Sequence, residues 1–272
     1  MLDLILLATI GALLLSTCLC ILGNFIVWQR ISYIGDSIAH SSLLGLILAE
    51  LLHTSVNIIT IIICFIFSIL FVNLHKKFKI TKDSLLIFNT QFSLSLGFIL
   101  LSVFSSGRLL NNYFFGSILA IDIKDIYIIF VILIFIILLT YIYWEKLLLI
   151  TLNNTIANSE GINTKIFNIV FIFFLSLVIA FSIKFIGILL VPSLLILPAL
   201  ASLNIFNSPF KSILFSIVLS ANAIVLGILL SSIINIQPSP LISFILIVVI
   251  ILKVFITYIY NKIKLSSHSA RK

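Results

Sequence analysis

Long apolar runs recur along almost the whole chain, and they constrain its fold more than any other feature. Each run has about 18 residues or more, enough as an α-helix to cross a hydrocarbon core of about 30 Å. Apolar residues make up 62% of the 272 residues and charged residues only 9%, so no water-soluble domain of useful size fits between the runs. The sequence therefore predicts an all-α fold, a polytopic transmembrane helical bundle.

The runs divide into eight or nine membrane spans, depending on whether the chain turns near Lys184. The first run is too long for the apolar core of a signal peptide, so we interpret it as a retained span. With the turn included, the expected spans are about Leu4–Trp28, Ser32–Leu52, Thr54–Leu74, Ser84–Phe104, Ile123–Trp144, Ile166–Ser182, Phe185–Phe206, Ser212–Ile233 and Leu241–Tyr260.

Basic residues predict the orientation, because Lys and Arg accumulate on the cytoplasmic side of membrane proteins. The segments HKKFKITKD (75–83) and NKIKLSSHSARK (261–272) are the richest in Lys and Arg, and both are expected inside. With nine spans, Arg30, Lys146, Lys165 and Lys211 fall on the same side, which places the N-terminus outside and the C-terminus in the cytoplasm. The net charge of +8 is scattered through short connections, a pattern that argues against a nucleic-acid partner.

A carboxylate and an imidazole lie four residues apart inside the second expected span, in ISYIGDSIAHSSLLG (31–45). An ionisable group in a span costs at least a few kcal/mol and usually marks an ion pathway or a ligand site. Residues four apart on a helix differ by only about 40°, so Asp36 and His40 point the same way and can share one cation. Their oxygen and nitrogen donors suit Zn²⁺ and also Mn²⁺. The alternative is an internal Asp–His hydrogen bond that holds two helices together.

Glu50 projects within about 40° of Asp36 on the same helix, nearer the outer surface. It either extends a cation route or is a solvated residue near a helix end.

No motif for ATP hydrolysis occurs in the chain. The phosphate-binding pattern G-x-x-x-x-G-K-[ST] is absent, so ATP must be hydrolysed by a separate subunit if the chain takes part in ATP-driven work. The H-E-x-x-H pattern of zinc proteases is absent as well. We therefore expect a translocation protein and not an enzyme.

Two stretches resemble a known family. GNFIVWQRISYIGDSIAHSSLLG (23–45) resembles the permease subunits of bacterial ABC transporters that import zinc or manganese, particularly the zinc-uptake permeases. KFIGILLVPSLLILPALAS (184–202) is similar to the same family through Lys184, Gly187 and Pro198, which we expect to have gating or structural roles. Because Pro198 bends its span, that helix is either a gate or a structural kink.

The resemblance extends to the connection TIANSEGI (155–162), where Ala157 and Gly161 have the small-residue spacing of the coupling loop of ABC importers. In that loop a short helix docks in a groove of the ATPase. The alternative is an ordinary polar turn. Gln91 stands where the family often has a histidine in the fourth span.

The family implies one ABC transporter permease domain over residues 1–272, located in the inner membrane. Its implied partners are a second copy of itself, a cytoplasmic ATP-binding subunit and a periplasmic metal-binding protein. The family's motif aspartate and histidine match Asp36 and His40, so two copies would offer two carboxylates and two imidazoles to one ion. No permanently bound cofactor is implied, because zinc or manganese is the transported ion. The alternatives are a manganese or iron importer of the same family and a secondary carrier driven by an ion gradient.

Overall fold

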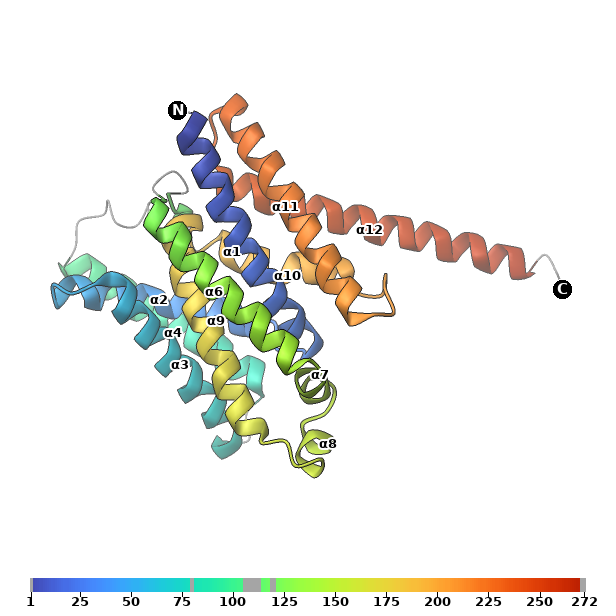
Figure 1. Ribbon diagram of the computed structural model, residues 1–272, viewed down its shortest axis with the longest axis horizontal. Coiled ribbons are helices and arrows are strands. Elements are labelled where there is room, and N and C mark those ends of the chain that lie inside the picture. Colours follow the sequence, from blue (N-terminus) through green and yellow to red (C-terminus); the bar gives the residue numbers. More distant parts are fainter. Residues whose placement is uncertain (1, 79–80, 105–113, 118–120, 270–272) are drawn as a thin grey trace.

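The computed structural model describes residues 2–78, 81–104, 114–117 and 121–269, and in these ranges it contains helices and no strands. The expected all-α fold is therefore confirmed. The helices are, in chain order, α1 (Leu2–Trp28), α2 (Tyr33–Leu51), α3 (Val56–Phe78), α4 (Lys82–Phe104), α6 (Ile123–Ile142), α7 (Trp144–Leu152), α8 (Asn154–Ser159), α9 (Thr164–Ile186), α10 (Leu190–Ser202), α11 (Pro209–Ile234) and α12 (Pro238–Ser269). They form a bundle from which the second half of α12 extends (Figure 1).

Seven helices in the described part of the chain are long and apolar enough to cross a membrane: α1, α2, α4, α6, α9, α11 and α12. Two further apolar stretches are shorter, namely Val56–Leu70 within α3 and the 13-residue helix α10. The multi-pass character of the chain agrees with the sequence, but the expected count of eight or nine spans is not confirmed.

The helix ends gather at two opposite sides of the bundle. The end of α1, the starts of α2, α4 and α9, and helix α8 line a common cavity. The end of α10 and the start of α11 line a groove that also includes the end of α1. We call this side the α8 end. On the other side, which we call the Gly187 end, Gly116 and Gly187 meet each other, and Ser239 in the first turn of α12 bonds to the neighbouring Ile186 carbonyl.

Helix α1 is central in the bundle. It packs against α6, α9, α10 and α11, and its side chains Leu19, Phe25 and Ile26 are at most 1% exposed. Gly23 permits the closest of these approaches, since a Cβ atom there would overlap the carbonyl oxygen of Leu195 in α10. Small residues allow this close backbone packing between membrane helices.

Helices α2, α3 and α4 pack together as a second group, and α9 contacts both α3 of this group and α1. The two groups are joined further by α10, which lies against α1 and also reaches the first turn of α2, where a Cβ on Gly35 would overlap the side chain of Leu195. The turn of α2 that carries Asp36 is therefore held between the two groups.

Helices α6 and α12 leave most of their surface uncovered by protein. Only 17% of the α6 span and 11% of the α12 span are buried, and their exposed side chains are mainly Ile, Leu, Phe and Val. Such surfaces suit contact with lipid acyl chains.

All three cysteines are free and buried. Cys20 is 0% exposed, and its sulfur lies 3.2 Å from the hydroxyl oxygen of Ser220 in α11. Buried free cysteines of this kind act as small apolar side chains in the packing.

Candidate functional site: the Asp36–His40 pair

Asp36 and His40 lie on one face of α2 and touch. His40 Nε2 is 3.4 Å from Asp36 Oδ1. The side chain of Asp36 is 37% exposed and that of His40 is 16% exposed, so the face they share is open at Asp36 and more enclosed at His40. The carboxylate oxygen and Nε2 thus lie close together on this face. The other imidazole nitrogen, Nδ1, is buried and has no hydrogen-bond partner among the described residues.

The local sequence explains how α2 accommodates a carboxylate. The helix begins at Tyr33, so Asp36 lies in its first turn. There the partial positive charge of the helix N-terminus stabilises a negative side chain by roughly 0.3–1 kcal/mol. Ser32 makes no side-chain cap at this helix start. Asp36 is the acidic residue of the first turn. The pair therefore lies one to two turns from the α8 end and not at the middle of the span.

The other candidate ligands are not brought to this pair. Glu50 is exposed near the far end of α2, about 21 Å along the helix from Asp36 at 1.5 Å per residue. Gln91 of α4 is exposed as well. Within the described residues, no three His, Cys, Asp or Glu side chains come together as a metal site. One copy of the chain thus offers one carboxylate and one imidazole.

Helix α8 lies at the position of the expected coupling loop. Asn153 caps its start by accepting a hydrogen bond from the Thr155 amide at 2.8 Å, and the Thr164 hydroxyl donates to Asn158 Oδ1 at 2.7 Å, which ties α8 to α9. The Ala157 methyl group is 0% exposed, so its small size serves packing within the chain. The α8 side chains available to a partner include Ile156, which is 50% exposed.

Gly161 ends this segment in a left-handed turn with φ of 78°. A Cβ atom placed there would meet nothing within 4 Å. The glycine is therefore needed for its backbone conformation and not for a close contact inside the chain.

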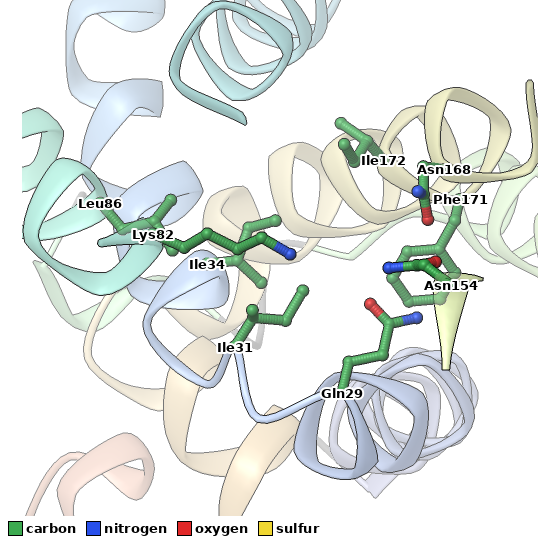
Figure 2. Close-up of a pocket in the computed structure, with 9 residues that line it drawn as sticks. All are labelled: Gln29, Ile31, Ile34, Lys82, Leu86, Asn154, Asn168, Phe171 and Ile172. Atoms are coloured by element: carbon green, nitrogen blue, oxygen red, sulfur yellow. The ribbon is translucent and has the colours of Figure 1, made fainter. Parts of the chain in front are cut away.

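A cavity of about 50 Å³ separates α8 from the helices that lead to the Asp36–His40 pair. Figure 2 shows that Gln29, Lys82, Asn154 and Asn168 point into it from four different segments. Ile34, two residues before Asp36, forms part of its wall. The pair itself does not line this cavity. Its lining shows that α8 lies across the cavity from the first turns of α2 and α4.

Lys184 and Gly187 lie where α9 ends. Lys184 Nζ is 3.5 Å from Asp125 Oδ1 and 4.7 Å from the ring centroid of Phe185, so it links the Gly187 ends of α9 and α6. The expected turn near Lys184 is present, but it occurs at Gly187 and not between Ser182 and Phe185. This is a correction of the expected boundary, because the first break in helical backbone after α9 is the positive φ of Gly187, 82°.

Gly187 also has a close neighbour. A Cβ atom on Gly187 would overlap the backbone of Phe115 and Gly116, and a Cβ atom on Gly116 would overlap Gly187. The Ser239 hydroxyl lies 2.7 Å from the Phe115 carbonyl oxygen and 2.8 Å from that of Ile186, so it can donate to either. Two glycines and a serine thus join α9, α12 and residues 114–117.

Pro198 lies inside α10. A proline has no N–H, so the carbonyl of Leu194, four residues earlier, loses its helical donor. The Cys20 thiol points at that carbonyl oxygen at 3.8 Å, and the Ser216 hydroxyl donates to the Pro198 carbonyl at 3.1 Å. The turn of α10 that contains Pro198 is therefore packed between α1 and α11.

Lys253 of α12 is a residue that our sequence interpretation did not select. Its Nζ donates to the carbonyl oxygens of Leu203 at 2.6 Å and Leu200 at 3.2 Å, which are at the C-terminal end of α10. A cation is favourable at this position of a helix. The signal in the sequence was a single lysine inside an otherwise apolar span.

Comparison with known proteins identifies the class. Residues 1–257 match the ABC 3 transport family, and the chain belongs to this family. It is a membrane permease subunit of an ABC transporter and not an enzyme, with ATP hydrolysis in a separate subunit.

The individual relatives include proteins named for two different metals. The chain is 36% identical over 237 residues to the high-affinity zinc uptake system membrane protein ZnuB of Buchnera aphidicola subsp. Baizongia pistaciae, with 86% of this chain and 91% of that protein covered. It is 29% identical over 248 residues to the manganese import system permease protein ScaB of Streptococcus parasanguinis, with 90% and 89% covered. The family resemblance seen in the motifs is thus confirmed.

A solved structure is similar over nearly the same length. PsaBC from Streptococcus pneumoniae in complex with Fab has a TM-score of 0.81 and 26% sequence identity, and the match covers 90% of this chain and 89% of that chain. The arrangement of helices in Figure 1 is therefore similar to one found in a solved structure.

Proposed function

We propose that this permease imports zinc and that Asp36 and His40 bind the ion during its passage. The observation that carries the proposal is the contact of the two side chains on one face of α2, where Asp36 remains 37% exposed within a membrane-spanning helix. Ionisable groups in a span usually face a pathway or another protein surface. Carboxylate oxygen and imidazole nitrogen are donors that zinc accepts.

The second half of the site comes from a second copy of the chain. Zinc usually takes four ligands in a tetrahedral arrangement, and one copy offers Asp36 and His40 only, since the described residues hold no larger ligand cluster. Two copies related by a twofold axis supply two carboxylates and two imidazoles. The open face beside Asp36 leaves room for such a partner.

Nδ1 of His40 is buried without a hydrogen-bond partner among the described residues, which supports a site whose side chains take more than one conformation. A buried nitrogen without a hydrogen bond costs about 1–3 kcal/mol, and an imidazole that binds a metal usually donates its other N–H to an acceptor. A second conformation or a partner chain that supplies the acceptor removes this cost. Alternation between arrangements that open to opposite sides is what transport requires.

Zinc is preferred to manganese because the zinc-uptake relative shares 36% of its aligned residues with this chain, whereas the manganese relative shares 29%. The donor set alone fits both metals.

The α8 end is the cytoplasmic side in this proposal, which places the N-terminus outside and the C-terminus inside. Basic residues of the described chain support this, because Arg30, Lys82, Lys146, Lys165 and Lys211 all lie in or beside segments at the α8 end. The ATP-binding subunit docks on α8 and its neighbours. The metal-binding protein then delivers zinc at the Gly187 end, and the whole assembly is in the bacterial inner membrane.

Replacement of His40 by Ala or of Asp36 by Ala tests the proposal. Each change removes two of the four ligands of a twofold site, so the uptake of radiolabelled zinc should fall below about a tenth of the wild-type rate. The measurement uses cells without other high-affinity zinc importers. Glu50→Ala is the matched control, because this carboxylate is remote from the pair, and it should transport normally.

Several results would contradict the proposal. Normal zinc uptake by His40→Ala removes the pair from the pathway. If His40→Ala or Asp36→Ala abolishes manganese uptake and leaves zinc uptake intact, the transported metal is manganese and not zinc. Uptake that persists without an ATP-binding subunit favours the secondary carrier.

A further inference from the structure

A buried polar seam runs between α2 and α4 beside the Asp36–His40 pair. We define it as Ser37 and Ser41 of α2 with Asn89 and Ser93 of α4, all at most 1% exposed. Asn89 Nδ2 donates to Ser37 Oγ at 2.5 Å and to Ser41 Oγ at 3.0 Å. The Ser93 hydroxyl donates to Asn89 Oδ1 at 3.4 Å. No side-chain polar atom of the seam is without a partner.

The seam holds the same turn of α2 that carries the pair. Ser37 follows Asp36 directly and Ser41 follows His40 directly, so the two serines repeat the one-turn spacing of the pair on a face about 100° away. Asn89 spans that turn with its two N–H groups. A rotation or a slide of α2 against α4 breaks at least one of these bonds, and it also moves Asp36 and His40.

Apolar contacts already hold the two helices together. A Cβ on Gly97 would overlap the Leu43 side chain, so α4 touches α2 there as well, and Leu86 and Leu101 of α4 are buried. The hydrogen bonds of the seam fix the rotation and the register of the two packed helices. Hydrogen bonds between membrane helices have definite partners and distances, whereas packed leucines tolerate small displacements.

The pairing also shows that α2 and α4 run parallel. Residue numbers rise together along the contact, from Ser37 with Asn89 to Ser41 with Ser93 and then Leu43 with Gly97. If α2 slides by one turn in either direction, Asn89 faces only one of the two serines, because Gly45 or Tyr33 takes the place of the other. The seam therefore defines one register.

We propose that Asn89 is a positioning residue for the ion site: it fixes the rotation and register of α2 through Ser37 and Ser41, and thereby sets how Asp36 and His40 face the ion. This inference rests on the proposed function of the pair. It assigns no metal ligand to α4.

The test uses Co²⁺ alone as the probe, because its visible d–d absorption reports both binding and ligand geometry. The full-length permease, purified in lipid nanodiscs, is titrated as wild type, Asn89→Ala, the Ser37→Ala/Ser41→Ala double variant and the triple variant. We expect a Kd for Co²⁺ raised roughly tenfold by Asn89→Ala, the size seen when a group that orients a metal ligand is removed. The double variant should match it, and the triple variant should be no worse, because all three remove the same link.

Matched controls keep the result interpretable. Ser95→Ala removes an exposed hydroxyl on another face of α4 and should leave the Kd and the spectrum unchanged. Thermal unfolding of every variant shows whether the bundle is intact.

Two outcomes are distinct. If His40→Ala abolishes the Co²⁺ spectrum while Asn89→Ala and the serine double variant retain the wild-type Kd and spectrum, the positioning role is wrong and the proposed function stands. Additive losses in the triple variant also overturn the positioning role, since they indicate separate packing defects. If His40→Ala leaves the Co²⁺ spectrum unchanged, the proposed ion site itself fails.

Discussion

Gly187 and Gly161 both have positive φ angles, 82° and 78°, yet their surroundings differ. Gly187 is pressed against the backbone of Phe115 and Gly116, whereas nothing lies within 4 Å of a Cβ atom placed on Gly161. The first position therefore requires glycine for space and for conformation. The second requires it for conformation only.

Substitution of each glycine by Ala separates these two causes. Gly161→Ala should cost about 1–2 kcal/mol, the price of a left-handed L-residue. Gly187→Ala adds a backbone overlap that only a shift of α9 or residues 114–117 can relieve, so it should unfold at clearly lower temperature and give less inserted protein. Thermal unfolding of the purified permease measures both. Equal losses in the two variants would show that the Gly116 contact has no energetic weight.

The contact of Asp36 with His40 could be predicted from the sequence at this scale, because both are conspicuous in an apolar segment and lie one helical turn apart; their binding of an ion stays a prediction. Asn89 and Lys253 carry signals of the same kind, since each is polar or charged within a span. Neither was selected, because its importance depends on which helix it faces. Asn89 meets two serines of α2, a contact 48 to 52 residues away in sequence that one chain without its fold does not reveal.

Helix α10 depends on another helix for its end. With 13 residues it is about 20 Å long. The Lys253 ammonium donates to the Leu200 and Leu203 carbonyls at its end, and the Leu203 N–H of the following turn also donates to Leu200. Helix α12 thus supplies a charged donor to the end of α10.

Lys253→Met should destabilise the permease by about 1–3 kcal/mol, because two carbonyl groups lose a charged donor. Lys253→Arg keeps the charge and should recover part of that loss. The measurement is thermal unfolding in detergent, with Lys211→Met as the control; Lys211 is exposed in the first turn of α11, where removal of a positive charge is neutral or slightly favourable. An unfolding temperature for Lys253→Met equal to wild type would contradict the capping role.

Helix α8 has one face inside the chain and one face outside, and two substitutions address them separately. Ile156→Asp places a charge on an exposed apolar side chain, so it should leave permease stability unchanged while it weakens binding of the ATP-binding subunit at least about tenfold. Ala157→Leu forces a large side chain into a filled site and should lower stability by about 1–3 kcal/mol.

Co-purification with the ATP-binding subunit measures the first effect and thermal unfolding measures the second. The reverse pattern, in which Ile156→Asp unfolds the permease and Ala157→Leu abolishes only docking, would mean that α8 is oriented differently in the assembly.

Across the whole molecule, the sequence predicted the helical elements well and their interruptions less well. Helix α1 ends at Trp28 and α6 begins at Ile123, as expected. Those boundaries coincide with polar or charged residues, which hydropathy detects. The break between α9 and α10 lies in a mainly apolar run, where Lys184 indicates a turn nearby but only the backbone preference of Gly187 marks its position. The number of spans depends on this same region and on α3.

The burial of Cys18, Cys20 and Cys64 has a practical consequence for experiments on moving parts. Maleimide reagents need a thiol that they can reach, and these three are shielded by the bundle. Spin labels or fluorophores can therefore be attached to cysteines introduced at α8 or at the Gly187 end in the otherwise native chain. A cysteine-free background would be the poorer choice, since it removes the thiol that lies beside Ser220 and the Leu194 carbonyl and so disturbs the packing of α1 against α10 and α11.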